Sequence, residues 1–91
     1  MNWQVVWLPD AEDELTGAWL NAPDRSAVTQ AAHLIDMQLE NDPENAGAPY
    51  TNGRRSLHVP PLAVIFRVLP DVQRVEVVHV WQPQATNGQL P

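Results

Sequence analysis

The residues that could act on an anionic group are concentrated in the second half of this chain. Four of its five positively charged residues follow residue 53, and none of the five is a lysine. A guanidinium can stabilise negative charge on a phosphate, and an imidazole beside it can carry a proton. Arg67 and His79 are therefore the candidates for catalytic groups.

The same residues also have structural interpretations. Arg67 stands in an almost unbroken apolar run, PPLAVIFRV. Three interpretations of its guanidinium are open: a buried group with all its hydrogen bonds made, a surface ion-pair partner, or the cation of a binding face. An arginine and a histidine on adjacent strands commonly make a surface or partner contact, paired with a carboxylate such as Glu76. Trp81 is the candidate interface aromatic. The predicted partner-binding residues are Arg54, Arg55, Arg67, His79 and Trp81.

No cofactor or metal site is expected. His33, His58 and His79 are far apart in the sequence, no second histidine follows any of them at helical ligand spacing, and the chain has no cysteine. The sequence also lacks a glycine-rich loop that could hold phosphates and a Ser-His-Asp arrangement.

The acidic residues lie mostly in the first half. Nine of the eleven precede residue 54, where Arg25 is the single base, and the net charge is −6. Affinity for nucleic-acid backbones comes largely from cations, so direct binding to free nucleic acid is not expected. The first residues do not read as a signal peptide, and no apolar run approaches the roughly 20 residues of a membrane span. We therefore expect a cytoplasmic protein that does not contact a membrane.

The first half predicts one strand and two helices. Residues 3–8 alternate as a strand, with Trp3 and Trp7 on one face. A helix follows Pro9, and Asp10 is its expected cap. Its expected buried stripe is Ala11, Leu15, Ala18 and Trp19. A second helix covers 24–40, with Pro23 near its first turn. Its expected inner face is Val28, Ala31, Ala32, Ile35 and Leu39, widened by Leu34 and Met37.

The second half predicts three strands. After a loop over 44–53, they cover residues 56–59, 62–69 and 74–81, and short turns join them into an antiparallel meander. The N-terminal strand must then join the sheet at an edge or beside the last strand. We expect one domain over 1–82 and a flexible C-terminal tail over 83–91.

The element order is therefore β-α-α-β-β-β. It predicts an α+β fold in which a helical hairpin packs on one face of a curved, mainly antiparallel four-stranded sheet. Within 62–69, Leu62, Val64, Phe66 and Val68 make the better core face, which leaves Arg67 on the face away from the helices. Val75, Val77, His79 and Trp81 share one face of the last strand. If that is the outer face, His79 becomes a neighbour of Arg67.

This order resembles the RelE/ParE superfamily of toxins from type II toxin–antitoxin systems, which includes plasmid stabilisation proteins. The resemblance covers residues 2–81 and rests on VVWLPDAEDEL, RRSLHVPPLAVIFRVLPD and VEVVHVW. It implies a small toxin that a cognate antitoxin protein neutralises. Members of the superfamily either cut ribosome-bound mRNA, as RelE-like toxins do, or poison DNA gyrase, as ParE-like toxins do.

The positions that carry catalysis in RelE-like nucleases are empty in this chain. By position, the arginine early in the third strand of the sheet corresponds to Ala63. The residues just after the last strand are Gln82 and Pro83, where the family often has histidine and arginine. With lysine absent too, a functional nuclease is not the favoured interpretation.

Three hypotheses follow. The first is a ParE-like toxin, gyrase-directed or catalytically degenerate, whose main partner is its antitoxin. The second is a non-toxic interaction module with the same fold, and a homodimer belongs with that alternative. The third is a ribosome-dependent mRNA endonuclease that uses Arg54, Arg55, Arg67 and His79.

Overall fold

The structure is a computed structural model that describes residues 2–83. Its elements in chain order are β1 (Gln4–Trp7), α1 (Pro9–Asn21), α2 (Arg25–Asn41), β2 (Ala48–Pro49), β3 (Arg55–Val59), β4 (Leu62–Leu69) and β5 (Arg74–Trp81). Short 3-10 turns, η1 (Thr51–Gly53) and η2 (Pro70–Val72), precede β3 and β5. The predicted tail over 83–91 lies outside the described residues, apart from Pro83.

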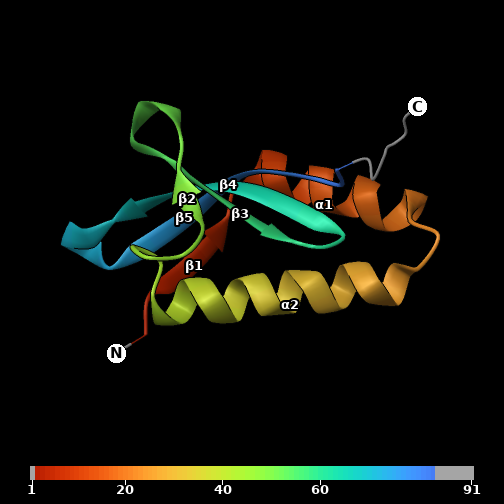
Figure 1. Cartoon of the computed structure of the whole chain (residues 1–91), viewed down its shortest axis with the longest axis horizontal. Helices are drawn as coiled ribbons and strands as arrows, with labels where there is room; N and C mark the ends of the chain where they lie inside the picture. Colours follow the sequence, from red (N-terminus) through yellow and green to blue (C-terminus); the bar gives the residue numbers. More distant parts are fainter. Residues whose placement is uncertain (1, 84–91) are drawn as a thin grey trace.

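The strands form a single mixed sheet in the order β1-β5-β4-β3-β2 (Figure 1). Its three long antiparallel strands, β3, β4 and β5, confirm the predicted meander. β1 runs parallel to β5, with Val5 opposite Val75, so the N-terminal strand joins the sheet beside the last strand.

The sheet has five strands where the sequence predicted four. The extra strand, β2, pairs with the start of β3 and comes from the segment predicted as a loop. Arg55 holds this segment in place, because its Nε donates a hydrogen bond of 2.9 Å to the carbonyl oxygen of Ala46. Gly47 follows at a φ of 64°, in the left-handed region that favours glycine.

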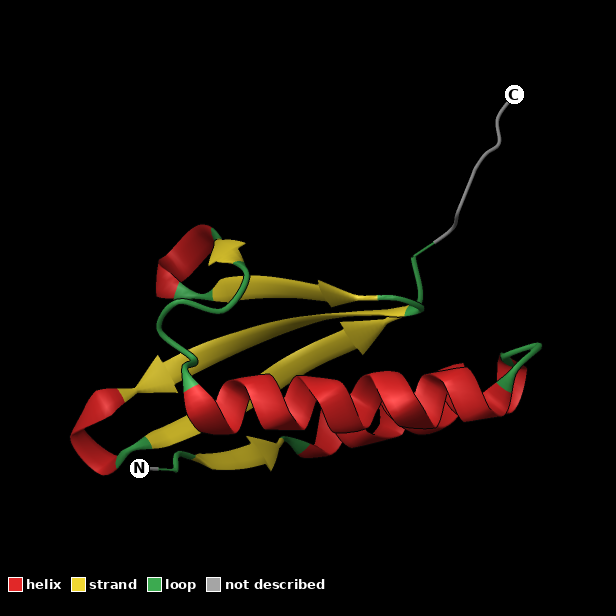
Figure 2. Cartoon of the chain, turned by 60° about the horizontal axis from the view of Figure 1, so that its bottom comes forward, coloured by secondary structure: helices red, strands yellow, loops and turns green. Residues whose placement is uncertain are grey.

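Both helices lie on the same side of the sheet (Figure 2). α1 begins at Pro9 with Leu8 as its N-cap and no side-chain cap, so the predicted capping by Asp10 is wrong. α2 does have a side-chain cap, since Asp24 accepts a hydrogen bond of 3.2 Å from the backbone N–H of Ala27. Pro23 therefore precedes the cap and is not in the first turn.

The core lies between the helices and one face of the sheet. Leu62, Val64 and Phe66 of β4 are fully buried there against helix residues such as Ile35. Trp7 of β1 and Trp3, just before that strand, pack against the same cluster. In contrast, Leu34 and Met37 are exposed, so α2 buries a narrower face than predicted.

A β-bulge in β5 changes which of its side chains face the core. Phe66 of β4 pairs with Val77, but the preceding residue Ile65 pairs with His79, so Val78 has no partner on β4. Val75 and Val77 therefore belong to the core, whereas His79 shares the opposite face with Ile65. The prediction that Val75, Val77, His79 and Trp81 share one face is wrong.

Two glycines with positive φ provide a matched test of the β2–β3 contact. A Cβ at Gly47 would meet the carbonyl oxygen of Ser56, whereas a Cβ at Gly53, with φ 74°, meets nothing within 4 Å. Gly53→Ala should lower the free energy of unfolding by about 1 kcal/mol, the cost of a left-handed alanine. Gly47→Ala should lower it by roughly 3 kcal/mol, because steric overlap adds to that cost. Urea unfolding measures both; equal losses would contradict the close approach of this segment to β3.

Candidate functional site

The face of the sheet opposite the helices holds most of the candidate residues, and we call it the outer face. Its members follow from the strand register and from the alternation of side chains. They are Gln4 and Val6 of β1, Ser56 and His58 of β3, Ala63, Ile65, Arg67 and Leu69 of β4, and Arg74, Glu76, His79 and Trp81 of β5.

Arg67 lies on this outer face, as predicted, and forms an ion pair with Glu76. Its Nε and Nη2 lie 2.7 Å and 2.6 Å from the Oε1 of Glu76, the residue directly opposite on β5. The Glu76 side chain is only 11% exposed. Arg74 approaches the second oxygen of the same carboxylate at 3.7 Å. The guanidinium of Arg67 is therefore already bound to a carboxylate, as in the ion-pair interpretation of the sequence.

Arg67 and His79 are not brought together as an opposed pair. Arg67 is opposite Glu76 and His79 is opposite Ile65, so the bulge residue Val78 intervenes. A phosphate held by the guanidinium would have the Glu76 carboxylate as its nearest neighbour, and like charges repel. The register therefore does not form the two-residue catalytic site that the sequence suggested.

His79 instead contacts a carboxylate on α1. β1 ends at Trp7, and its last hydrogen bond to β5 runs from the Leu8 N–H to the Val77 carbonyl oxygen, at 3.0 Å. After that point α1 lies beside β5 in place of β1. One oxygen of Glu14 accepts the Val80 N–H at 3.0 Å, and the other lies 3.4 Å from Nδ1 of His79. Glu14 thus satisfies a backbone donor at the strand edge and positions the imidazole.

Three strands meet at the far end of the outer face. His58 of β3 and Trp81 of β5 both lie opposite Ala63 of β4, and Ala63 is only 6% exposed. Trp81 is 44% exposed, and its role as an interface aromatic stays a prediction. His58 was not among the predicted site residues, although its position next to the buried Leu57 indicates an outward side chain.

The paired arginines at the start of β3 have different surroundings. Arg55 is in register with Phe66, on the helix side of the sheet, and its guanidinium donates to the carbonyl oxygens of Ala46 and Gly47. Arg55 thus stabilises the fold locally. Arg54 precedes the strand and is partly buried. Contact of either residue with a partner stays a prediction.

The outer face thus offers two imidazoles, an indole and arginines engaged by a carboxylate. Within residues 2–83, no three His, Asp or Glu side chains gather in a group that could hold a metal ion. Across the same residues, no helix is long and apolar enough to cross a membrane. The one tryptophan of the outer face, Trp81, is exposed, and the arginines of that face, Arg67 and Arg74, both contact Glu76.

Comparison with solved structures identifies the fold. A chain of the RelBE2 toxin–antitoxin complex from Mycobacterium tuberculosis aligns with a TM-score of 0.76 at 14% identity, covering 91% of this chain and 100% of the other. A chain of the chromosomal ParDE system from Pseudomonas aeruginosa aligns at 0.65 with 17% identity, covering 90% and 97%. The isolated RelE toxin from Escherichia coli aligns at 0.65 with 13% identity, covering 92% and 87%.

These similarities confirm the expected RelE/ParE-like fold. No protein-family model matches the sequence, and no curated protein matches it either. At 13–17% identity the solved structures show the fold alone, and they include both RelE and ParE toxins.

The Arg67–Glu76 pair can be tested with a double-mutant cycle. Arg67→Gln, Glu76→Gln and the double variant should give a coupling free energy of about 0.5–1 kcal/mol, because the carboxylate is buried but the arginine is half exposed. Urea unfolding at low and high salt measures the coupling. The same cycle between Arg67 and His79 is the control and should give no coupling; coupling there in place of the Glu76 pair would contradict the register.

Proposed function

We propose that this chain is the toxin of a type II toxin–antitoxin pair, that it acts through protein contacts as ParE-like toxins do, and that a cognate antitoxin neutralises it. The fold supports the toxin class, because the chain aligns over nine-tenths of its length with both RelE and ParE structures. Antitoxin partnership is supported by the similar structures that are toxin–antitoxin complexes.

The single observation that favours protein contacts over RNA cleavage is the ion pair between Arg67 and Glu76. Cleavage without a metal needs a free cation to stabilise charge that develops on the phosphate. In this chain the best-placed guanidinium lies 2.6 Å from a carboxylate oxygen, and that carboxylate would repel the phosphate. The neighbouring outer-face positions are the apolar residues Ala63 and Ile65, both buried.

A second candidate is ribosome-dependent mRNA cleavage of the RelE type. His58 and His79 share the outer face with Trp81, and imidazoles can serve as acid and base. Glu14 beside His79 is the kind of carboxylate that orients a catalytic imidazole. This alternative makes a definite prediction, since it requires the two histidines for any toxic effect.

Expression of the chain alone in a bacterium, from a tightly repressed promoter, tests the proposal. We expect growth arrest with induction of the DNA-damage response, and inhibition of purified DNA gyrase by the purified chain. The His58→Ala/His79→Ala variant should remain toxic. Trp81→Ala should reduce toxicity, because it removes a large exposed aromatic side chain from the contact surface.

The other outcomes would overturn the proposal in different ways. Cleavage of ribosome-bound mRNA that disappears in the double histidine variant would establish the nuclease. Normal growth with folded, soluble protein would indicate the non-toxic interaction module. Val72→Ala is a suitable control, because Val72 is an exposed apolar residue in the η2 turn.

A further inference from the structure

A groove runs between α1 and α2 on the side of the molecule away from the sheet's outer face. It has an apolar section of about 270 Å³ and an acidic section of about 540 Å³. Leu15, Thr16 and Ala32 line both sections, so the two lie next to each other. None of these residues belongs to the outer face described above.

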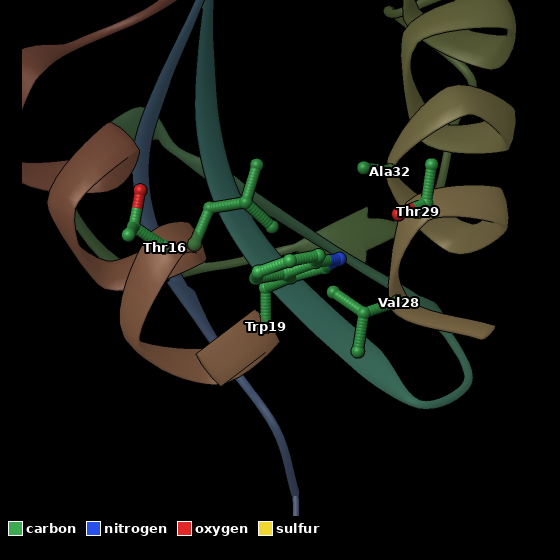
Figure 3. Close-up of a pocket in the computed structure, with 6 residues that line it drawn as sticks. Thr16, Trp19, Val28, Thr29 and Ala32 are labelled. Carbon is green, nitrogen blue, oxygen red and sulfur yellow. The ribbon is translucent and has the colours of Figure 1, made fainter. Parts of the chain in front are cut away.

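The apolar section is built around Trp19. Figure 3 shows the Trp19 ring extending from α1 toward Val28 of α2, with Thr16 and Thr29 on the two walls. Val28 is fully buried in the floor, whereas Trp19 remains 38% exposed. An indole that stays exposed beside a buried apolar floor can receive an apolar side chain from another molecule.

The acidic section carries three carboxylates. Glu12 and Asp13 project from the first turns of α1, and Asp36 faces them from α2. Asp36 is fixed in place, because Nε1 of Trp7 donates a hydrogen bond of 2.7 Å to its Oδ1. The residues that line this section include no positively charged side chain. An occupant of this end of the groove therefore has to bring positive charge.

The opposite end carries the single base of the first half of the chain. The guanidinium of Arg25 lies 4.6 Å from the centre of the Trp19 ring, and its Nη2 donates to the Leu20 carbonyl oxygen at 3.3 Å. Between Val28 and Asp36 the groove follows α2 for eight residues, or about 12 Å at the rise of a helix. That length suits roughly two turns of a partner helix.

We propose that this groove binds a cationic amphipathic helix of the antitoxin, with apolar side chains set between Trp19 and Val28 and lysine or arginine side chains beside Glu12, Asp13 and Asp36. The inference rests on the proposed function for the identity of the partner. The chemistry of the partner follows from the groove alone, because apolar anchors at helical spacing fit the apolar section and positive flanks complement the acids.

The charges disfavour the other occupants. A nucleic acid would place phosphates against three carboxylates. A second copy of this chain would bring its own acidic helices, with a net charge of −6 on each copy. An acidic helix would meet like charge along the same length. The groove therefore selects the sign of the partner's charge as well as its apolar pattern.

The experiment uses the purified full chain and two synthetic peptides of about four helical turns. Both peptides carry leucines along one face, with lysines on the flanks of the first and glutamates on the flanks of the second. Calorimetric titration should show at least about tenfold tighter binding of the lysine peptide. Raising the salt from about 0.1 M to about 0.5 M should weaken that binding, since screening reduces the attraction.

Matched variants locate the binding. Glu12→Gln/Asp13→Asn should weaken the lysine peptide about tenfold. Glu44→Gln/Asp71→Asn removes the same charge from exposed positions outside the groove and should have little effect. Trp19→Ala should weaken binding of the lysine peptide at both low and high salt, because it removes an apolar contact. Val72→Ala, outside the groove, should leave that binding unchanged. Circular dichroism and thermal unfolding of each variant confirm that it is folded.

Equal binding of the two peptides, or equal weakening by the two acid-neutralising pairs, would overturn the inference, because attraction would then be a property of the whole acidic surface. So would full binding by folded Trp19→Ala. The outcome is independent of toxicity. A chain that binds the lysine peptide in this groove but leaves growth unaffected refutes the proposed toxin role alone, and a toxic chain that binds neither peptide refutes the groove alone.

Discussion

The unpartnered residue Val78 determines what the outer face of the sheet presents. Before it, Val75 and Val77 point toward the helices; after it, Val80 does. The bulge therefore keeps a valine in the core on both sides while turning His79 outward. In an unbroken ladder His79 would point under the helices and Val80 would lie in solvent, at a cost in buried apolar area and in an unpaired imidazole.

The bulge also separates two electrostatic environments along β5. On one side of it, the Glu76 carboxylate contacts Arg67 and Arg74; on the other, Glu14 of α1 contacts the strand edge and His79. Five further acids lie on the helices, and three of them, Glu12, Asp13 and Asp36, line the groove. The protein thus has an outer face on which one carboxylate contacts two arginines, and a helical layer with an excess of negative charge. Both features favour protein partners over nucleic acid.

The sequence alone predicted the helical layer and the sheet, because apolar and charged residues alternate clearly in the elements that form them. In β4, Arg67 interrupts an apolar run at one position of the alternation, which assigns the faces of the strand without ambiguity. In β5, valines occupy both faces of the strand. The alternation of apolar and polar residues therefore does not reveal that the pairing with β4 shifts by one residue. The pairing of His79 with Ile65 depends on that shift. β2 was missed for a different reason, since side-chain bonds from Arg55 hold it and its own residues, Ala48 and Pro49, are poor strand formers.

Nuclear Overhauser contacts between β4 and β5 test the central claim most directly. The account predicts cross-strand contacts between Phe66 and Val77 and between Ile65 and His79, with Val78 opposite no residue of β4. Contacts of Ile65 with Val78 and of Val64 with His79 would contradict it, because that unbroken ladder places the His79 imidazole beneath the helices and removes it from the outer face.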